Sequence, residues 1–317
     1  MKSVVEDIKK GSFKPVYLFY GEEAYLKQQY KNRLKNAVLP EGDTINLSIY
    51  SGKGIDVKEM IAQADTMPFF AEHRLLLIED SGFFKNANQQ LAEYIPFIPE
   101  ETIMLFVESE VDKRGKLYKA VSKKGSVVEF TAQNEQTLTR WILGILKTEG
   151  KMITSGAMKQ FLEKTGTDME RIRQELEKLI CYCMEKESIT EEDVAVICSE
   201  QTENKIFDMI NAMAEKKQKK AMELYYDLLA LKEPPMRILY LITRQFNLLM
   251  QVKELSEEGY SAKTISERLK MAGFIVRNCL RQAEYFSLKT LKEALQDCVR
   301  MEEAVKTGRM NDVMSVE

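Results

Sequence analysis

The sequence predicts an α/β domain followed by helices alone, and three observations lead to this fold class. Short runs rich in Val, Ile, Leu, Tyr and Phe alternate with amphipathic patterns over the first part of the chain. From Glu135 onward only helical periodicity recurs. With 317 residues, 44% hydrophobic and 30% charged, the chain is long enough for two or three domains and has the composition of a soluble globular protein.

The first domain is expected to hold five strands, at residues 16–20, 45–50, 74–79, 103–107 and 127–130. Helical patterns lie between them, at residues 24–37, 57–64, 87–95 and 116–124. Strands that alternate with helices in this way form a mostly parallel sheet with both faces covered.

The helical part divides into two predicted domains. Ile172, Leu176, Leu179 and Cys183 share one helical face, and an apolar stripe runs over residues 238–252, after Pro234 and Pro235 at its entry. A polar stretch at residues 199–204 separates these patterns. The predicted domains are therefore residues 1–133, 134–203 and 204–317, and the last stripe is expected to combine internal core with part of an oligomer interface.

Charge and composition exclude several classes of protein. Residues 1–133 hold 18 Lys and Arg against 19 Asp and Glu, residues 134–203 hold 9 against 14, and residues 204–317 hold 19 against 16. No segment is basic enough for a nucleic-acid binder held by phosphate neutralisation alone, and the lysine-rich run at residues 216–220 fits a solvated helix start better than a DNA contact. Without a signal region or a bilayer-spanning apolar run, the chain is expected in the cytoplasm.

Catalytic and metal sites are not expected. Five cysteines form neither a disulfide framework nor C-x-x-C spacing, and Cys181 and Cys183 point to different sides of a helix. His73 is the only histidine, and a plain surface role fits it better than a catalytic one. We therefore expect no catalytic residue, no cofactor and no metal.

The segment YLFYGEEAYLK at residues 17–27 lies where a nucleotide-binding domain carries its phosphate loop. A P-loop needs G-x-x-x-x-G-K-[ST], so that backbone N–H groups and a lysine surround the phosphates. Here Gly21 is followed by Glu22 and Glu23, which suit a helix N-terminus but repel phosphate. The sequence thus predicts that this domain does not bind ATP. Glu79 and Asp80, at the end of the apolar run at residues 75–80, are expected to be solvated.

Motifs along the chain resemble the delta subunit of the bacterial replicative clamp loader, the DNA polymerase III delta family. They are PVYLFYGEEAYL at 15–26, MPFFAEHRLLL at 67–77, GTDMERIRQELEKL at 166–179, RILYLITRQFNLL at 237–249 and VKTG at 305–308. Each motif is weak by itself, but together they span nearly the whole chain in the family's order. The resemblance implies a degenerate AAA+ module, a helical lid domain and a C-terminal helical collar domain.

The resemblance also implies a function. A delta subunit binds the ring-shaped sliding clamp (beta), holds one interface open, and works beside the ATPase subunits (gamma and tau) and delta-prime to load the clamp on primed DNA. It implies a cytoplasmic, nucleoid-associated protein with no membrane partner. Whether the chain counts as an enzyme stays open, because the family is classed with DNA-directed DNA polymerase although no catalytic site is expected here.

The segment DTMPFFA at residues 65–71 is the candidate clamp-binding element. It follows a short amphipathic helix and precedes a strand, and Pro68 stops the helix, so the two aromatic side chains cannot both face one core. By resemblance, Phe69 and Phe70 enter the clamp's peptide-binding pocket, with Met67 at the margin. The family often has Leu-Phe at this pair. Packing of one or both rings under the following strand is the structural alternative.

Two further functions remain open from the sequence. The lid domain has Met169 where ATP-sensing lids carry an arginine, and Arg171 and Arg173 are expected to pair with Glu175 and Glu177 on an exposed helical face. One alternative is a divergent AAA+ ATPase, against which the missing phosphate-loop lysine argues. The other is a DNA-binding helical regulator, whose best support is the lysine-rich run at residues 216–220.

Overall fold

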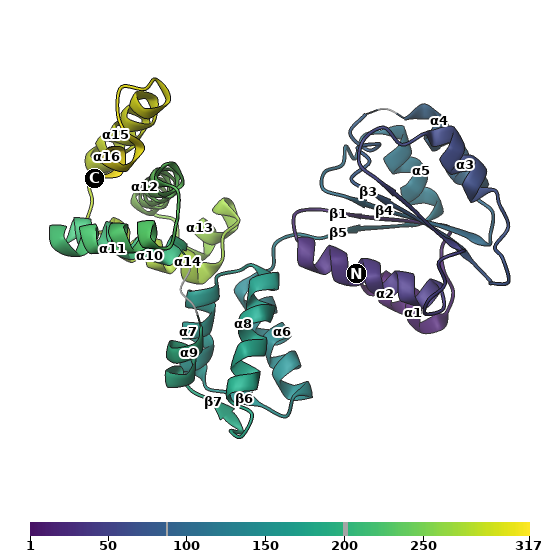
Figure 1. Ribbon diagram of the computed structural model, residues 1–317, viewed down its shortest axis with the longest axis horizontal. Helices are drawn as coiled ribbons and strands as arrows, with labels where there is room; N and C mark the ends of the chain where they lie inside the picture. Colours follow the sequence, from purple (N-terminus) through teal and green to yellow (C-terminus); the bar gives the residue numbers. More distant parts are fainter. Residues whose placement is uncertain (87, 199–201) are drawn as a thin grey trace. The chain divides into compact units, whose positions relative to one another are not determined.

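The structure, a computed structural model, describes residues 1–86, 88–198 and 202–317 (Figure 1). It divides into two compact units, Met1–Ala132 and Gln133–Glu317. The first unit ends one residue before the predicted boundary. The second contains both predicted helical domains, and part of the polar stretch expected to separate them, residues 199–201, lies outside the described residues, as does Ala87, the predicted first residue of a helix.

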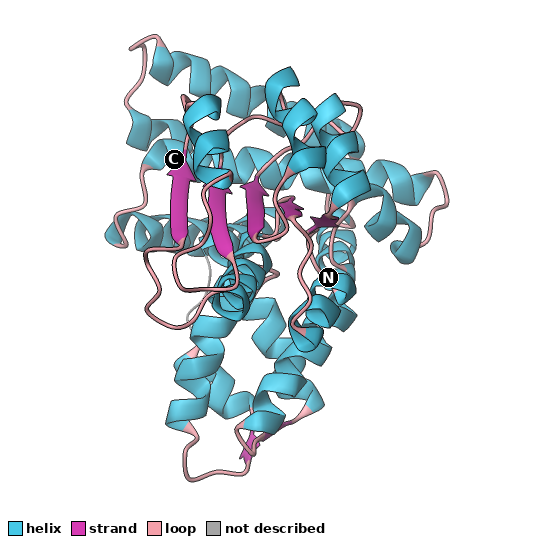
Figure 2. Cartoon of the chain, turned by 90° about the vertical axis from the view of Figure 1, so that its right-hand side faces the viewer, coloured by secondary structure: helices cyan, strands magenta, loops and turns pink. Residues whose placement is uncertain are grey.

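The first unit is built on a five-stranded parallel sheet, seen in magenta in Figure 2. Its strand order is β2-β3-β4-β1-β5. The strands are β1 (Val16–Tyr20), β2 (Leu47–Ser51), β3 (Arg74–Glu79), β4 (Thr102–Glu108) and β5 (Ser126–Glu129). Each pairing is parallel, so the carboxyl ends of all five strands lie at one edge of the sheet and the amino ends at the other.

Helices cover both faces of this sheet, as predicted. Figure 1 shows α1 and α2 on one face and α3, α4 and α5 on the other. Their bounds are α1 (Lys2–Lys10), α2 (Ala24–Val38), α3 (Val57–Ala64), α4 (Gln89–Tyr94), the 3-10 turn η1 (Ile95–Phe97) and α5 (Lys116–Lys124). Alternate β1 residues serve the two faces: Leu18 packs in the core under α3 to α5, whereas Phe19 stacks edge-on against Phe130 and Tyr17 donates to Asp7 of α1.

Over its described residues, the second unit consists of helices and two strands of two residues each, joined by loops. Its helices are α6 (Glu135–Thr148), α7 (Ser155–Thr165), α8 (Met169–Tyr182), α9 (Glu191–Ile197), α10 (Thr202–Ala214), α11 (Gln218–Ala230), α12 (Pro235–Glu257), α13 (Ala262–Leu269), α14 (Gly273–Ala283), α15 (Leu288–Lys306) and α16 (Asp312–Val316). The strands β6 (Met152–Ile153) and β7 (Ser188–Ile189) pair in parallel. The expectation that strands stop after residue 134 is therefore wrong, because strands this short leave no periodic signal.

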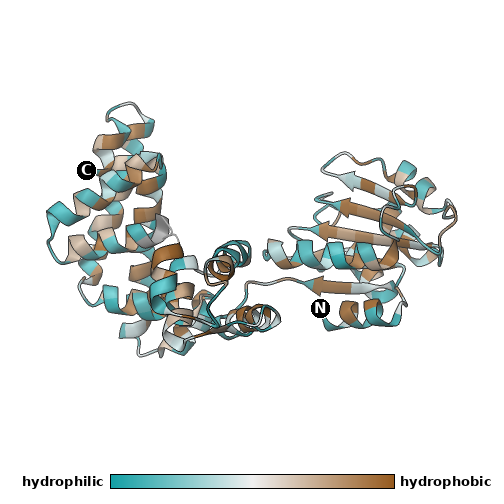
Figure 3. Ribbon diagram, turned by 60° about the horizontal axis from the view of Figure 1, so that its bottom comes forward, coloured by the Kyte–Doolittle hydropathy of each residue, from teal (hydrophilic) through white to brown (hydrophobic). Residues whose placement is uncertain are grey.

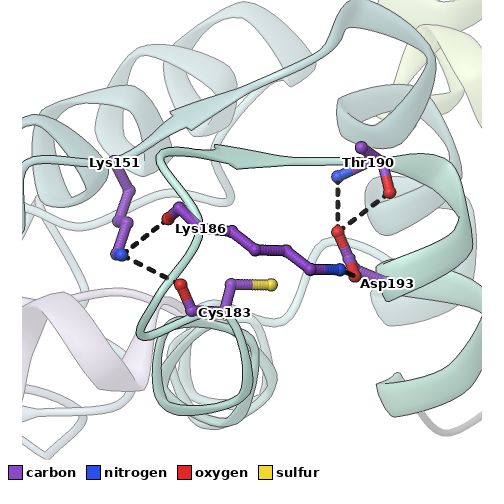
Figure 4. Close-up of polar contacts among 5 residues, drawn as sticks. All are labelled: Lys151, Cys183, Lys186, Thr190 and Asp193. Atoms are coloured by element: carbon purple, nitrogen blue, oxygen red, sulfur yellow. Dashed lines mark hydrogen bonds and ion pairs between the residues drawn. The ribbon is translucent and has the colours of Figure 1, made fainter.

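The segment around β6 and β7 is fixed by charged side chains (Figure 4). Lys151 donates to the carbonyl oxygens of Cys183, Met184 and Lys186, at 2.9, 2.7 and 2.7 Å, and so satisfies carbonyls at the end of α8. Asp193 caps α9 by accepting from the backbone and hydroxyl of Thr190, both at 2.9 Å. It also pairs with Lys186 at 2.5 Å.

Hydrophobic residues are concentrated inside each unit. Figure 3 shows hydrophobic colour along the strands of the sheet. In the second unit α12 is central, with Ile238, Ile242, Phe246, Leu249 and Val252 buried in one cluster, as the predicted stripe requires. The helix begins at Pro235, with Pro234 as its N-cap. Along the described ranges, none of the helices combines the length and the apolar character needed to cross a bilayer.

Gly21 is required by the turn that follows β1. It has a φ of 116°, and a Cβ there would lie 2.3 Å from the Phe130 carbonyl oxygen. Gly21→Ala should lower the free energy of unfolding by about 3 kcal/mol or more, since it adds a backbone clash to an unfavourable φ. Gly42→Ala is the control, because Gly42 has a φ of 85° and open space around it. If chemical denaturation gives the same loss of unfolding free energy for both variants, the requirement for glycine at position 21 is contradicted.

Asp193 should make the second unit sensitive to acid. Its hydrogen bonds to Lys186 and Thr190 lower the pKa of Asp193 to about 2. The folded pKa lies below the unfolded value of ~3.9, so the stabilisation is present above pH ~4 and is lost as pH falls toward 2. We expect Asp193→Asn to cost about 1 kcal/mol at pH 7, because Lys186 is half exposed. Urea unfolding at several pH values should show this difference vanish at low pH.

Candidate functional site

The predicted clamp-binding residues lie in the loop at residues 65–73, between α3 and β3, which we call the anchor loop. Met67, Phe69 and Phe70 expose 74%, 57% and 94% of their surface. The Phe69 and Phe70 rings pack on each other, edge to face, with centroids 4.5 Å apart. The prediction of a loop position is confirmed. Neither phenyl ring packs under β3, so the structural alternative is wrong.

An exposed group of this size has an energetic consequence. Burial of one large apolar side chain is worth about 1.5–3 kcal/mol, and here two phenyl rings and a methionine forgo it together. Clustered apolar exposure of this kind marks an interaction surface more often than a single exposed residue does.

The anchor loop is tied to the residues before β2. Asn46 accepts from the Phe69 N–H at 2.7 Å and donates from Nδ2 to the Phe69 carbonyl at 3.0 Å. Asp43 in turn accepts from Nδ2 of Asn46 at 2.8 Å. On the other side of the loop, buried Arg74 donates to the Met67 carbonyl over a long 3.4 Å. Sequence reasoning missed both residues, and for Asn46 the reason is that no local motif links it to Phe69, 23 positions away.

Phe70 has a φ of 49°, in the left-handed region. For a bulky residue this backbone conformation is unfavourable by about 1–3 kcal/mol and persists only where surrounding contacts fix it. The hydrogen bonds to Phe69, immediately before it, supply such contacts. The residue with the most exposed ring of the loop, Phe70, therefore has a strained backbone conformation.

The opposite edge of the sheet is where a doubly wound domain would bind a ligand. The chain leaves β1 toward α2 on one face and leaves β4 toward α5 on the other, so the carboxyl ends of these neighbouring strands form the switch point. Here the turn at Gly21 lies against the Phe130 peptide, and Phe130 bonds to both Tyr20 and Glu23. The backbone after β5 thus occupies the space beside this turn.

Acidic side chains fill the rest of this edge. Glu108, at the end of β4, is 3% exposed and accepts from the backbone and hydroxyl of Ser81 and from the Gly82 N–H. Burial raises the pKa of the Glu108 carboxyl. Glu79 pairs with Lys31 of α2 at 2.7 Å, so the expectation that this acid is merely solvated is wrong. Lys27 donates to the Glu108 carbonyl at 3.2 Å. Lys31 and Lys27 therefore both have partners within the protein at the edge where a phosphate group would need a free lysine.

The predictions for α8 are only partly correct. Arg173 pairs with Glu177 at 2.6 Å on the helix surface, as expected. Glu175, however, is buried and pairs with Lys178 at 2.6 Å, so its expected place on an exposed face is wrong. The helical period places Glu175 beside Leu176 and Leu179, at the border of the apolar face.

The remaining sequence candidates are His73, the cysteines of α8 and the lysine-rich run. His73 is half-buried and packs edge-on against Phe13 at 5.8 Å, so it is not a plain surface histidine. Cys181 is exposed and Cys183 buried, on different sides of α8 as predicted. The run at residues 216–220 is exposed and leads into α11. Within the part of the chain that the structure describes, His, Cys, Asp and Glu side chains form no group able to hold a metal.

Comparison with known families gives two matches along this chain. The family model described as DNA polymerase III, delta subunit, matches residues 17–131, which include the anchor loop. The model described as the C-terminal domain of the same subunit matches residues 203–317.

Individual relatives extend the likeness to nearly the full length. DNA polymerase III subunit delta of Bacillus subtilis is 30% identical over 326 residues, covering 99% of this chain and 94% of the relative. A probable delta subunit of Aquifex aeolicus is 21% identical, covering 77% and 72%. The solved DNA clamp loader delta protein of Bacillus subtilis superposes with a TM-score of 0.67 over 99% of this chain and 96% of its own. The chain therefore belongs to the DNA polymerase III delta subunit family.

Proposed function

We propose that this chain is the clamp-loader subunit that binds the sliding clamp and opens it for loading onto primed DNA, without binding ATP itself. The observation that carries the proposal is the outward exposure of Met67, Phe69 and Phe70 on a loop fixed by the sheet. Membership of the delta family supports it, as does the description of the similar Bacillus subtilis structure as a DNA clamp loader delta protein.

The anchor loop supplies binding energy through apolar burial. Insertion of the two phenyl rings into a pocket of the clamp would desolvate side chains that are now 57% and 94% exposed. Aromatic residues at the centre of a small interface carry most of its affinity. The ring opens only if the subunit binds the open form more tightly than the closed form. The neighbouring surface of α3, which leads directly into the loop, provides the second contact for that discrimination.

ATP enters through the partner subunits. The first unit is a degenerate AAA+ module whose switch point is occupied by the Phe130 backbone and by Glu79 and Glu108 with their lysine partners. The gamma or tau subunits and delta-prime complete the ring of subunits, in the cytoplasm. Residues 134–203 serve as the lid domain and residues 204–317 as the collar domain, where Tyr240 and Tyr285 are 64% and 61% exposed.

Independent DNA binding by a helical regulator has less support. In the lysine-rich run, Lys217 pairs with Glu215 at 2.7 Å and Lys219 approaches Glu223 at 3.9 Å. Acidic neighbours reduce the positive field that phosphate neutralisation needs.

Removal of the two phenyl rings should abolish clamp binding. We expect Phe69→Ala/Phe70→Ala to weaken the affinity for a bacterial sliding clamp by about 100-fold or more, since each ring acts as a hot spot. The exposure of the rings predicts unchanged unfolding. Tyr285→Ala, which removes an exposed aromatic side chain from the second unit, is the control. Surface plasmon resonance without nucleotide tests this, and parent-like affinity of the double variant would refute the anchor.

ATP should not bind to the isolated chain. Millimolar Mg-ATP is expected to leave the thermal unfolding midpoint unchanged, because a ligand stabilises only a fold that binds it. Isothermal titration calorimetry provides an independent check. A saturable heat or a concentration-dependent rise of the midpoint would support the divergent ATPase instead.

A further inference from the structure

Asn46 makes a paired contact with the backbone of one residue of the anchor loop. Its side-chain amide accepts from the Phe69 N–H at 2.7 Å and donates to the Phe69 carbonyl at 3.0 Å, so both backbone groups of this residue are bonded to one side chain. An amide is suited to this task, because only asparagine and glutamine present a donor and an acceptor side by side. These two hydrogen bonds fix the position of the Phe69 backbone relative to β2.

Asn46 is itself held in one orientation. Asp43 accepts from Nδ2 of Asn46 at 2.8 Å and from its backbone N–H at 3.0 Å, and the Asn46 carbonyl accepts from the Leu75 N–H at 2.8 Å. Because a carboxylate only accepts, the bond to Asp43 requires the NH2 group of the Asn46 amide on that side. The amide oxygen is therefore left to face the Phe69 N–H. Asn46 is only 2% exposed, so it cannot itself form a substantial contact with a partner.

Asp65, at the start of the loop, accepts from the Tyr94 hydroxyl at 2.6 Å, but the residues on either side of Phe69 have weaker ties. Arg74 reaches the Met67 carbonyl at 3.4 Å, and its Nε and Nη1 find no acceptor among the described residues. Phe70 has a φ of 49°, a conformation that a free loop would leave. The Asn46 contact is therefore the strongest constraint on the outward position of Phe69 and Phe70.

We propose that Asn46 is a positioning residue that presets the anchor loop in its clamp-binding conformation before the clamp is met. This inference rests on the proposed function. A partner binds only the fraction of molecules whose loop is already in the competent conformation, so the apparent affinity falls in proportion to that fraction. Preorganisation of this kind removes an ordering cost from the binding step.

The test is the rate of clamp association with the full chain carrying Asn46→Ala. We expect the association rate constant to fall about tenfold while the dissociation rate constant stays near that of the parent, since the bound contacts are unchanged. Amide hydrogen exchange should show the Phe69 N–H exchanging faster in the variant. Asn46→Asp keeps the acceptor for the Phe69 N–H but turns a carboxylate oxygen toward the Asp43 carboxylate and the Phe69 carbonyl, so it should give at least as large a loss in the same direction.

Asn88→Ala is the matched control. Asn88 accepts from the Leu91 N–H at the start of α4, so the substitution also removes an asparagine hydrogen bond from the first unit but leaves the contact between Asn46 and Phe69 in place. It should lower stability without changing the association rate. If the parent and Asn46→Ala associate with the clamp at the same rate, or if the loss lies in dissociation, the positioning role is overturned while the proposed function stands. If the parent does not bind the clamp, both fail.

Discussion

The parallel register of the five strands is the constraint on which the rest of the structure depends. Because each strand runs the same way, the turns after the strands gather at one edge and the loops before them at the other. The pairing of Leu47 with Leu75 places Asn46 beside the anchor loop, although the two lie far apart in the sequence. The pairing of β1 with β5 places Phe130 against Gly21. The residue contacts at both edges thus follow from strand pairing within the same sheet.

The two edges have opposite chemical characters. At the carboxyl edge, polar groups have internal partners: Lys31 holds Glu79, and Ser81 and Gly82 satisfy Glu108. At the amino edge, apolar side chains remain exposed, with Phe70 94% exposed. A domain that keeps the α/β architecture, pairs the polar groups of its carboxyl edge internally and exposes an apolar loop at the other edge is suited to binding a protein. Chemistry that consumes ATP then belongs to partner subunits in the proposed assembly.

The sequence predicted the features that depend on local patterns. Residues 16–20 and 57–64 have the predicted bounds, since an apolar strand and a short amphipathic helix are defined by their own periodicity. The absence of a phosphate loop after Gly21 was readable from residue types alone. The contact of Asn46 with Phe69 was not, because it arises from strand pairing across 23 positions. The burial of Glu175 was missed because the helical period leaves border positions undetermined, and β6 and β7 are too short to carry a pattern.

The proposed function requires this chain to open a clamp through its own binding energy, so the distance across the clamp interface is the quantity to measure. A sliding clamp labelled with a donor and an acceptor on either side of one interface would be titrated with the chain in the absence of nucleotide. We expect a saturable fall in energy transfer as the two sides of the interface separate. Unchanged energy transfer at saturating concentration, or a fall that requires ATP, would contradict it.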